Sequence, residues 1–527
     1  MSIYLADFQR KNFPKKFFYG VVLIIIIFGI YIRFANLERK VFWNDECLTL
    51  LRVSGYANSE LIEKVFNGKL ITVKELQNYQ TFNSQRNIND VFNALSRSPE
   101  HSPLYYLILR YWIQLFGSSV ATIRMLSALI SLLVFPSIYW LSWELFNSHR
   151  LSLFSIIFIA VSPFHVIYAQ EARPYSLWTV TILLSSAALL YALSSKKQLS
   201  WIAYTATLIL GLYTSILSVI VMAAQGFYIL VRENLRIGKN FINYLICILI
   251  TGLAFTPWLS IVEWSEFKST NAIATRGLSI LVWIKIFFLN LTRIVYDQEI
   301  NKEGYQLYLQ LLIMIIIFLS LFYSLLYVYK KASYQSSMFV IILAIFTLSS
   351  LILPDLLLGG RRSSVSRYLI PCYLGFQLSY SYYLGNEFIK AINFGKRKLL
   401  QISILMVLLL GMLSTIFYSQ EEFWWNKYIS QHNPEISVIV NQTESPLLIS
   451  DGSVSNMLSL SRLLNKDIKL QLFAGSQTPY ISKEINDFND IYLFNISRDF
   501  KNKFEQKGYK TKKVFQQEQT TLYKLEK

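Results

Sequence analysis

Long apolar runs recur along this chain, and each is long enough to cross a lipid bilayer as a helix. A helix rises about 1.5 Å per residue, so roughly 20 apolar residues span the hydrocarbon core. Only 16% of the 527 residues are charged, whereas 54% are hydrophobic. This composition excludes a disordered chain, a collagen-like fibre and an ordinary soluble enzyme. The predicted spans are residues 17–35, 120–146, 151–168, 175–194, two halves of 199–231, 241–263, 307–329, 337–357, 368–386 and 398–417.

This pattern predicts an all-α polytopic membrane protein with about eleven transmembrane helices. The predicted number of transmembrane helices depends on how two segments are interpreted. Residues 103–116 are apolar but short and carry Arg110 and Gln114, so we predict that they do not cross. Residues 199–231 would form a single helix about 50 Å long. We predict two short spans there, with a turn at residues 213–215.

The basic residues favour one orientation in the membrane. The net charge is +18, and the Lys and Arg residues gather in short clusters between apolar runs, as the positive-inside rule produces. We therefore expect an inner-membrane protein with a cytoplasmic N-terminus and an extracytoplasmic C-terminal domain, and no nucleic-acid partner. One apolar stretch, 278–290, lies in the outer loop 264–306 and is predicted to be interfacial. The clusters expected in the cytoplasm are 196–197, 232–239, 330–331 and 390–398.

Two segments outside the membrane are expected to fold as soluble structure. The first outer loop covers about residues 36–119 and belongs to the predicted transmembrane domain, 1–417. The tail, 418–527, alternates β-like and helix-like runs, which predicts a small extracytoplasmic α/β domain. The β-like runs are 446–450, 468–473, 490–494, 510–516 and 520–525, and the helix-like runs are 453–464 and 498–507.

Two adjacent carboxylates, Asp45 and Glu46, follow the first span closely. An acidic pair in a loop is more often solvated or a helix cap than catalytic. Here the pair lies near the membrane surface, between Phe42–Trp43 and the amphipathic run 47–53. Partial burial at that place would raise the basicity of a carboxylate. The pair therefore indicates a general base at the outer edge of the bilayer.

Arginines gather in a short outer loop, where charge statistics disfavour them. Arg361, Arg362 and Arg367 lie between two predicted spans, so we expect an anionic partner for them. A phosphate suits their planar bidentate donors. Contact with lipid headgroups or an ion pair with Asp355 is an equal alternative. The remaining outer charges are His101, Arg124, Glu171, Arg173 and Glu263.

Taken together, these motifs resemble the polytopic GT-C glycosyltransferases. The similarity is greatest to the family 39-like branch, which includes protein O-mannosyltransferases and the lipid A aminoarabinose transferase, and it covers about residues 17–417. One departure is His101-Ser102-Pro103-Leu104, where family members usually read His-Pro-Pro-Leu. The residues that carry the resemblance are Asp45-Glu46, His101 to Tyr106, Arg124, Ser127, Gln170 to Tyr175, Tyr213-Thr214 and Arg367 to Pro371.

The resemblance implies transfer of a sugar from a polyprenyl phosphate to an acceptor hydroxyl on the extracytoplasmic face, with inversion. Asp45 matches the family's proposed base, and Glu46 would orient the acceptor or hold a metal. The resemblance does not distinguish between a glycan, a lipid and a protein as the acceptor. Membrane lipids are expected as further partners. The donor phosphate would bind Arg367, Arg361, Arg362 and Arg173, and the other substrate contacts would be His101, Arg124, Glu171, Tyr175 and Tyr368.

Metal use and two rival functions stay open. Cys47, Cys247 and Cys372 lack metal-ligand spacing and are too few for a disulfide scaffold, which disfavours a Cys47–Cys372 bridge. A divalent ion is allowed but no His or Cys cluster requires one. A transporter or flippase of lipid-linked glycans should show more mid-span charges. An O-antigen ligase or polymerase should carry its large outer loop late in the chain.

Overall fold

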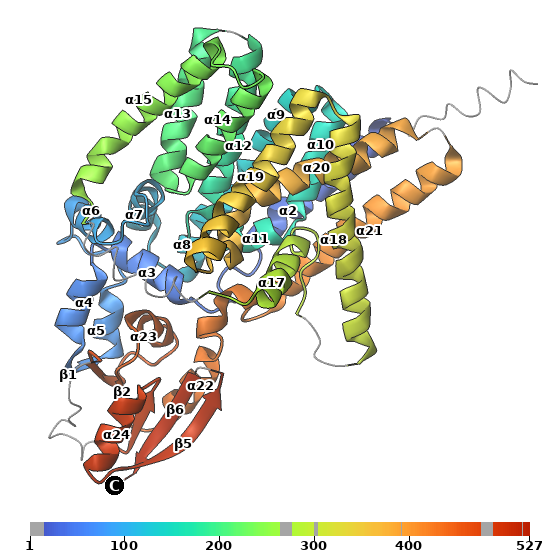
Figure 1. Ribbon diagram of the computed structural model, residues 1–527. Helices are drawn as coiled ribbons and strands as arrows, with labels where there is room; N and C mark the ends of the chain where they lie inside the picture. Colours follow the sequence, from blue (N-terminus) through green and yellow to red (C-terminus); the bar gives the residue numbers. More distant parts are fainter. Residues whose placement is uncertain are drawn as a thin grey trace, which may run out of the picture. The chain divides into compact units, whose positions relative to one another are not determined.

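The computed structural model describes residues 15–195, 197–263, 277–299, 304–391, 393–475, 488–518 and 520–526 (Figure 1). The chain divides into two compact units, which are described separately. The helical unit comprises 1–35, 99–105 and 124–420, and the sheet unit comprises 36–98, 106–123 and 421–527. The first outer loop and the tail therefore belong largely to one unit.

Helices occupy every apolar run that was predicted to span. Three of the runs divide, because 120–146 and 151–168 each fold as two helices and 199–231 breaks at its predicted turn. The helices of this unit are α2 (Lys15–Phe34), α8 (Val120–Leu132), α9 (Val134–Phe146), α10 (His149–Ala160), α11 (Pro163–Ala169), α12 (Tyr175–Ser195), α13 (Gln198–Thr214), α14 (Ser218–Arg232), α15 (Lys239–Ile261), α17 (Ile280–Thr292), α18 (Tyr305–Lys331), α19 (Tyr334–Leu358), η2 (Arg362–Ser364), η3 (Ser366–Leu369), α20 (Ile370–Lys390) and α21 (Phe394–Gln420).

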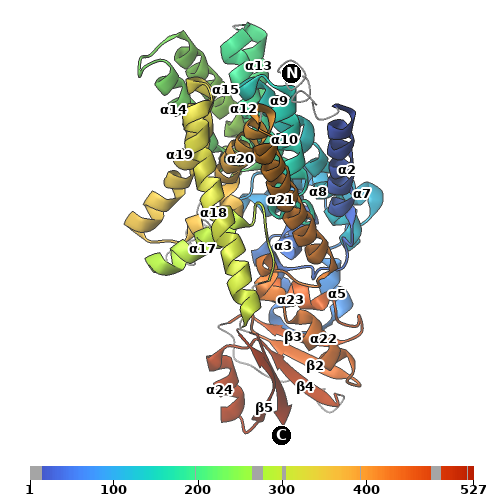
Figure 2. The ribbon, with the colours of Figure 1, turned by 90° about the vertical axis from the view of Figure 1, so that its right-hand side faces the viewer.

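Within the described residues, seven helices are long and apolar enough to cross a membrane, or up to eight if α10 and α11 form one bent span. The protein is therefore an integral membrane protein, and the number of eleven spans stays a prediction. Figure 2 shows α18 and α21 as long rods in the helical unit. The short helix α17 covers most of the stretch predicted to be interfacial, while residues 264–276 and 300–303 of that loop lie outside the described residues.

An arginine inside the helical unit fills the break between α10 and α11, which are bent by 62°. Arg33, which is fully buried, donates to the carbonyl oxygens of Ala160 (2.8 Å) and Ile159 (3.1 Å). These carbonyls end α10 and lack partners within the helix. Gly29 allows the close approach, because a Cβ there would lie 2.8 Å from the Cβ of Ala160.

In its described residues, the sheet unit contains six strands in the order β1-β3-β2-β4-β6-β5. The central strand β2 runs parallel to β3 and β4, and the outer pairs are antiparallel. All five strands predicted in the tail are present, which confirms the C-terminal sheet domain. The strands are β1 (Asn67–Thr72), β2 (Pro446–Ser450), β3 (Lys469–Phe473), β4 (Asp490–Phe494), β5 (Lys510–Gln517) and β6 (Thr520–Glu526).

Strand β1 comes from the first outer loop and was not predicted. It pairs with β3, with Leu70 opposite Gln471 and Thr72 opposite Lys469. The tail sheet is therefore completed by residues almost 400 positions earlier. The remaining helices of this unit are α3 (Asn44–Val53), α4 (Asn58–Val65), α5 (Val73–Asn78), α6 (Ile88–Ser96), α7 (Leu104–Phe116), η4 (Trp425–Ser430), α22 (Asn433–Asn441), α23 (Val454–Ser461) and α24 (Arg498–Gln506).

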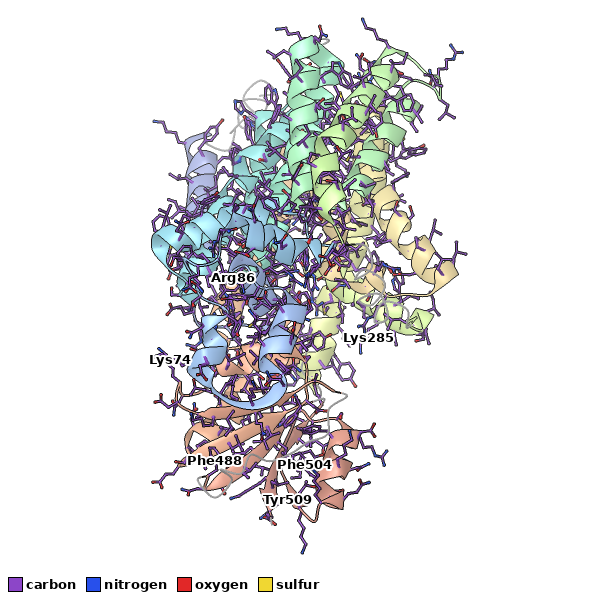
Figure 3. The ribbon with its side chains drawn as sticks, turned by 90° about the vertical axis from the view of Figure 1, so that its left-hand side faces the viewer. Lys74, Arg86, Lys285, Phe488, Phe504 and Tyr509 are labelled. Carbon is purple, nitrogen blue, oxygen red and sulfur yellow. The ribbon has the colours of Figure 1, made fainter. Side chains whose placement is uncertain are left out.

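Helix α24 covers one face of the sheet. Phe500 and Phe504 pack against Leu447 and Leu493 in one buried cluster, and Phe488 and Tyr509 lie beside it (Figure 3). Every residue of β2 is buried. A strand that is buried on both faces reads as a continuous apolar run, as the sequence PLLIS does.

Candidate active site

The two adjacent carboxylates occupy the first turn of α3 and differ sharply in environment. Glu46 is fully buried, and its Oε2 lies 2.8 Å from Nζ of Lys427 in η4, which is also fully buried. Nζ of Lys427 lies 5.7 Å from the ring centroid of Trp43. Glu46 is thus one half of an enclosed ion pair, which leaves its side chain poorly placed to contact an acceptor.

Asp45 is the more accessible carboxylate of the pair. It is partly exposed, whereas Asn44, Glu46 and Cys47 around it are buried. Its position in the first turn of α3 brings it close to the positive end of the helix dipole, which favours a negative charge. Its carbonyl accepts a hydrogen bond from Oγ1 of Thr49 at 2.9 Å, which keeps the turn regular. Its Oδ2 atom is buried, so Asp45 is held on a rigid element and only part of its side chain can be reached.

The N-terminal end of α3 is held by the tail. Asn44 donates through Nδ2 to Oδ1 of Asn456 (2.6 Å) and to Oγ of Ser455 (3.2 Å) in α23. Ser430 of η4 donates to Oδ1 of Asn44 at 2.8 Å. Ser459 donates to the carbonyl of Phe42 at 2.7 Å. Four contacts from two tail elements therefore fix Phe42 and Asn44, which precede Asp45 in the chain.

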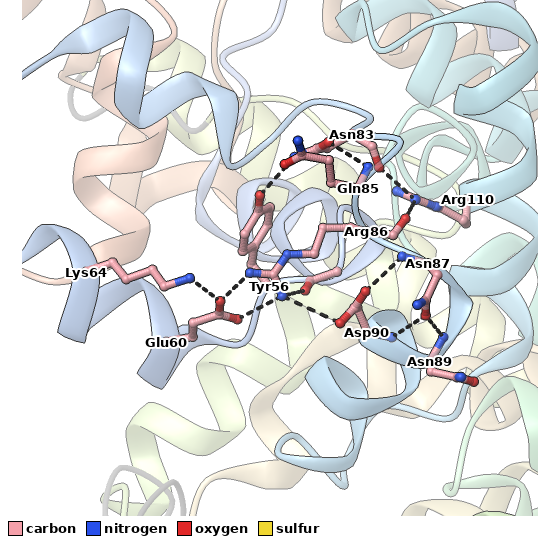
Figure 4. Close-up of polar contacts among 11 residues, drawn as sticks. Tyr56, Glu60, Lys64, Asn83, Gln85, Arg86, Asn87, Asn89, Asp90 and Arg110 are labelled. Carbon is pink, nitrogen blue, oxygen red and sulfur yellow. Dashed lines mark hydrogen bonds and ion pairs between the residues drawn. The ribbon is translucent and has the colours of Figure 1, made fainter.

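The C-terminal end of α3 is held by a polar cluster of the first outer loop (Figure 4). Arg110 donates to the carbonyl oxygens of Val53 (3.1 Å) and Arg86, and Arg86 in turn pairs with Glu60 and with Asp90 at 3.6 Å. These contacts satisfy a terminal carbonyl of α3, which has no partner within the helix. Asp45 consequently lies on a helix that is anchored at both ends.

Burial changes the acidity of two groups in this unit. Desolvation by burial raises the pKa of the Cys47 thiol to about 12, so this cysteine is not a thiolate nucleophile near neutral pH. Desolvation also acts to raise the pKa of Glu60, but hydrogen bonds from Lys64 and Arg86 outweigh it and lower that pKa below 4.5. All three cysteines are free and buried.

In the helical unit, Tyr175 brings two of the predicted phosphate ligands together. Its ring centroid lies 5.6 Å from the guanidinium carbon of Arg173 and 5.7 Å from that of Arg367. Arg367 also lies 5.7 Å from the ring centroid of Tyr368. Arg173 is 5% exposed, whereas Arg367 and Tyr368 are partly exposed. Arg367 is therefore the more accessible of the two arginines.

The other two arginines of the short loop behave differently. Nη1 of Arg362 lies 3.8 Å from Oδ1 of Asp355, so the alternative of an ion pair with Asp355 applies to Arg362. The other carboxylate oxygen of Asp355 accepts from the backbone N–H and the hydroxyl of Ser363, both at 2.7 Å. Arg361 is exposed. Asp355 thus holds the loop in shape.

The remaining predicted site residues, His101, Arg124 and Glu171, belong to the helical unit. Arg124 and Glu171 are almost fully buried, and Nε2 of His101 lies 3.5 Å from Oε1 of Glu100. Two residues that carried the resemblance also link this region: Ser127 bonds with the hydroxyl of Tyr105 (2.7 Å) and donates to the carbonyl of Arg173 (3.4 Å). No three His, Cys, Asp or Glu side chains group as metal ligands in the described parts of the chain.

Comparisons with known proteins agree with this architecture. Residues 100–261 match the family model described as dolichyl-phosphate-mannose-protein mannosyltransferase. No curated protein matches the chain in a sequence search. Among solved structures, ArnT from Cupriavidus metallidurans bound to undecaprenyl phosphate has 12% identity and a TM-score of 0.54, with 96% of this chain and 98% of ArnT covered.

Two structures of an archaeal enzyme are also similar. The oligosaccharyltransferase of Archaeoglobus fulgidus in the apo form has 10% identity and a TM-score of 0.50, with 88% of this chain and 65% of that chain covered. AglB from the same organism, in complex with an inhibitory peptide and a dolichol phosphate, has 10% identity and a TM-score of 0.50, with 97% of this chain and 74% of AglB covered. The chain thus has the GT-C fold of ArnT and AglB, and its residues 100–261 match the mannosyltransferase family model.

Proposed function

We propose that this protein is a membrane glycosyltransferase that moves a sugar from a polyprenyl phosphate to an acceptor hydroxyl on the extracytoplasmic face. The GT-C fold supports this proposal, and the structurally similar ArnT and AglB are described with undecaprenyl phosphate and dolichol phosphate. The observation that carries it is the contrast in α3, where Asp45 is accessible on an anchored helix while Glu46 is sealed in an ion pair.

In the proposed reaction, Asp45 accepts the proton of the acceptor hydroxyl. The acceptor oxygen then bonds to the anomeric carbon as the bond from that carbon to the phosphate oxygen breaks, with inversion at carbon. A general base needs a carboxylate that a substrate can reach, and Asp45 is partly exposed whereas Glu46 is buried against Lys427. Glu46 instead positions Asp45, because its contact with Lys427 fixes the first turn of α3.

The departing polyprenyl phosphate gains negative charge that a cation must stabilise. Arg367 is our first choice for this role, because it is partly exposed and its guanidinium carbon lies 5.7 Å from the ring centroids of both Tyr175 and Tyr368. Arg173 supports the same tyrosine, since its Nη2 donates to the Tyr175 hydroxyl at 3.3 Å. Arg361 is exposed and is our second candidate for binding the phosphate. Arg362 already contacts Asp355.

The test compares Asp45→Asn with Glu46→Gln in the full chain reconstituted in vesicles. The donor is the polyprenyl-phosphate sugar that accumulates in a strain lacking this protein, and undecaprenyl phosphate binding is followed separately. Asp45→Asn should lower transfer by roughly 10²- to 10⁴-fold, the usual effect of losing a general base, with binding unchanged. Full transfer by Asp45→Asn would reject Asp45 as the base. Failure of the parent to consume any accumulated lipid-linked sugar would reject the glycosyltransferase assignment.

A further inference from the structure

A polar recess lies among the ends of four helices in the helical unit. It is formed where α9, α12 and α14 end and where α19 begins, and its cavity volume is about 80 Å³. These helices neighbour one another in Figure 1, and Ser336 at the start of α19 donates to the carbonyl of Leu145 in α9 at 2.5 Å. The polar lining residues are Glu144, Ser194, Tyr228, Arg232, Gln335 and Ser336.

This recess is separate from the proposed phosphate site. Ser336 and Asp355 belong to the same helix, α19, and are nineteen residues apart. At about 1.5 Å per residue, roughly 28 Å separates them along the helix axis. The recess lies at the end where the basic clusters 232–239 and 330–331 adjoin α14 and α19. That end is the one predicted to face the cytoplasm.

Two opposite charges line the recess without pairing with each other. Glu144 accepts a hydrogen bond from Nε1 of Trp140 at 3.1 Å. Among the described side chains, neither Glu144 nor Arg232 forms an ion pair. Both are partly exposed, so a ligand can reach them. A carboxylate and a guanidinium that face one space and stay apart suit a ligand carrying both an ammonium and an anion.

The rest of the lining suits a small headgroup. Ser194 and Gln335 are exposed at the rim and offer neutral hydrogen-bonding groups. The inner wall is apolar, since Leu145 and Leu190 are buried there. The ring of Tyr228 is fixed edge-on against Phe339, with 5.0 Å between centroids. At about 10 to 15 Å³ for each water-sized group, a volume of about 80 Å³ has room for a small polar headgroup.

We propose that this recess binds a zwitterionic phosphoethanolamine group, with the phosphate at Arg232 and the primary ammonium at Glu144. The group comes either from phosphatidylethanolamine in the adjoining leaflet or from a soluble phosphoethanolamine. An ammonium donates hydrogen bonds to a carboxylate, whereas the trimethylammonium of phosphatidylcholine cannot. Phosphatidylglycerol offers the phosphate alone. The site should therefore select phosphatidylethanolamine over both other lipids.

The experiment measures lipid retention by native mass spectrometry of the full chain. The purified protein is offered equal amounts of phosphatidylethanolamine, phosphatidylcholine and phosphatidylglycerol. The parent should retain phosphatidylethanolamine about tenfold better than the others, as expected for one charge-assisted hydrogen bond. Glu144→Gln should abolish the preference over phosphatidylglycerol, and Arg232→Gln should weaken retention of all three. Arg236→Gln is the matched control, because Arg236 is exposed and does not line the recess.

Two further arms make the outcome decisive. Soluble phosphoethanolamine that displaces the lipid shows that the headgroup alone is bound, and failure to displace it identifies the lipid as the ligand. Glu144→Asp and Arg232→Lys, which retain the charges, should keep part of the selectivity if the neutral variants are poorly folded. Equal retention of the three lipids by the parent, or unchanged selectivity in a folded Glu144→Gln protein, would overturn the proposal.

Discussion

Replacing Lys427 by Met should destabilise the sheet unit strongly. The change keeps most of the side-chain volume but removes the ammonium that lies 2.8 Å from Oε2 of Glu46, with both side chains fully buried. The Glu46 carboxylate would then remain buried without its counter-charge. Breaking a buried pair in this way costs about 3 to 5 kcal/mol. For a unit of this size, that loss lowers the Tm by roughly 6 to 20 °C.

The double variant Glu46→Gln with Lys427→Met separates charge from packing. It removes both charges together, so it should recover most of the stability that Lys427→Met loses. Asp45→Asn is the matched control, because Asp45 is partly exposed and the 2.8 Å contact of Lys427 is with Glu46. Its Tm should stay close to that of the parent.

The assay combines thermal unfolding of the purified full chain with hydrogen–deuterium exchange. Peptides that cover α3 and η4 should exchange faster in Lys427→Met, because the ion pair joins these two elements. Peptides of α19, in the helical unit, should keep their protection. A Tm shift of about 1 °C or less with unchanged α3 exchange would refute the buried pair, as would a double variant no more stable than Lys427→Met.

Three other expectations follow from individual contacts. Arg367→Ala should lower sugar transfer by about tenfold to a hundredfold while Arg367→Lys retains part of it, and equal rates in reconstituted vesicles would exclude Arg367 from the phosphate site. Because the Glu60 pKa is lowered in the folded state, its pairing stabilises the protein above about pH 4.5, and this stabilisation is lost as pH falls through the lowered pKa. The free energy of unfolding of the parent should therefore fall below pH 4.5 by up to about 1 kcal/mol more than that of Glu60→Gln, as measured by thermal unfolding across this pH range. Arg33→Met should cost about 1 to 3 kcal/mol in thermal unfolding, because it leaves the carbonyl of Ala160 without its buried donor.

Local sequence patterns were enough to determine the helical segments and most of the tail. Apolar runs of spanning length are a property of consecutive residues, so α12 and α18 were predicted within a few residues of their ends. The strands of the tail could be predicted equally well, because short apolar runs between polar loops define them. The position of Asp45 just beyond the first span was also readable directly. These features depend on neighbours along the chain and on the hydrophobic effect.

Only the tertiary structure decided which carboxylate is enclosed and which strand completes the sheet. Asp45 and Glu46 look alike in sequence, but Glu46 meets Lys427, which lies 381 residues further along the chain. Strand β1, NGKLIT, contains Gly and Lys and has little strand propensity of its own, and its pairing with β3 makes it a strand. Burial and ion pairing depend on contacts between distant segments. Since no local periodicity encodes the partner of a residue, the roles of Glu46, Lys427 and Arg33 become visible only in the folded chain.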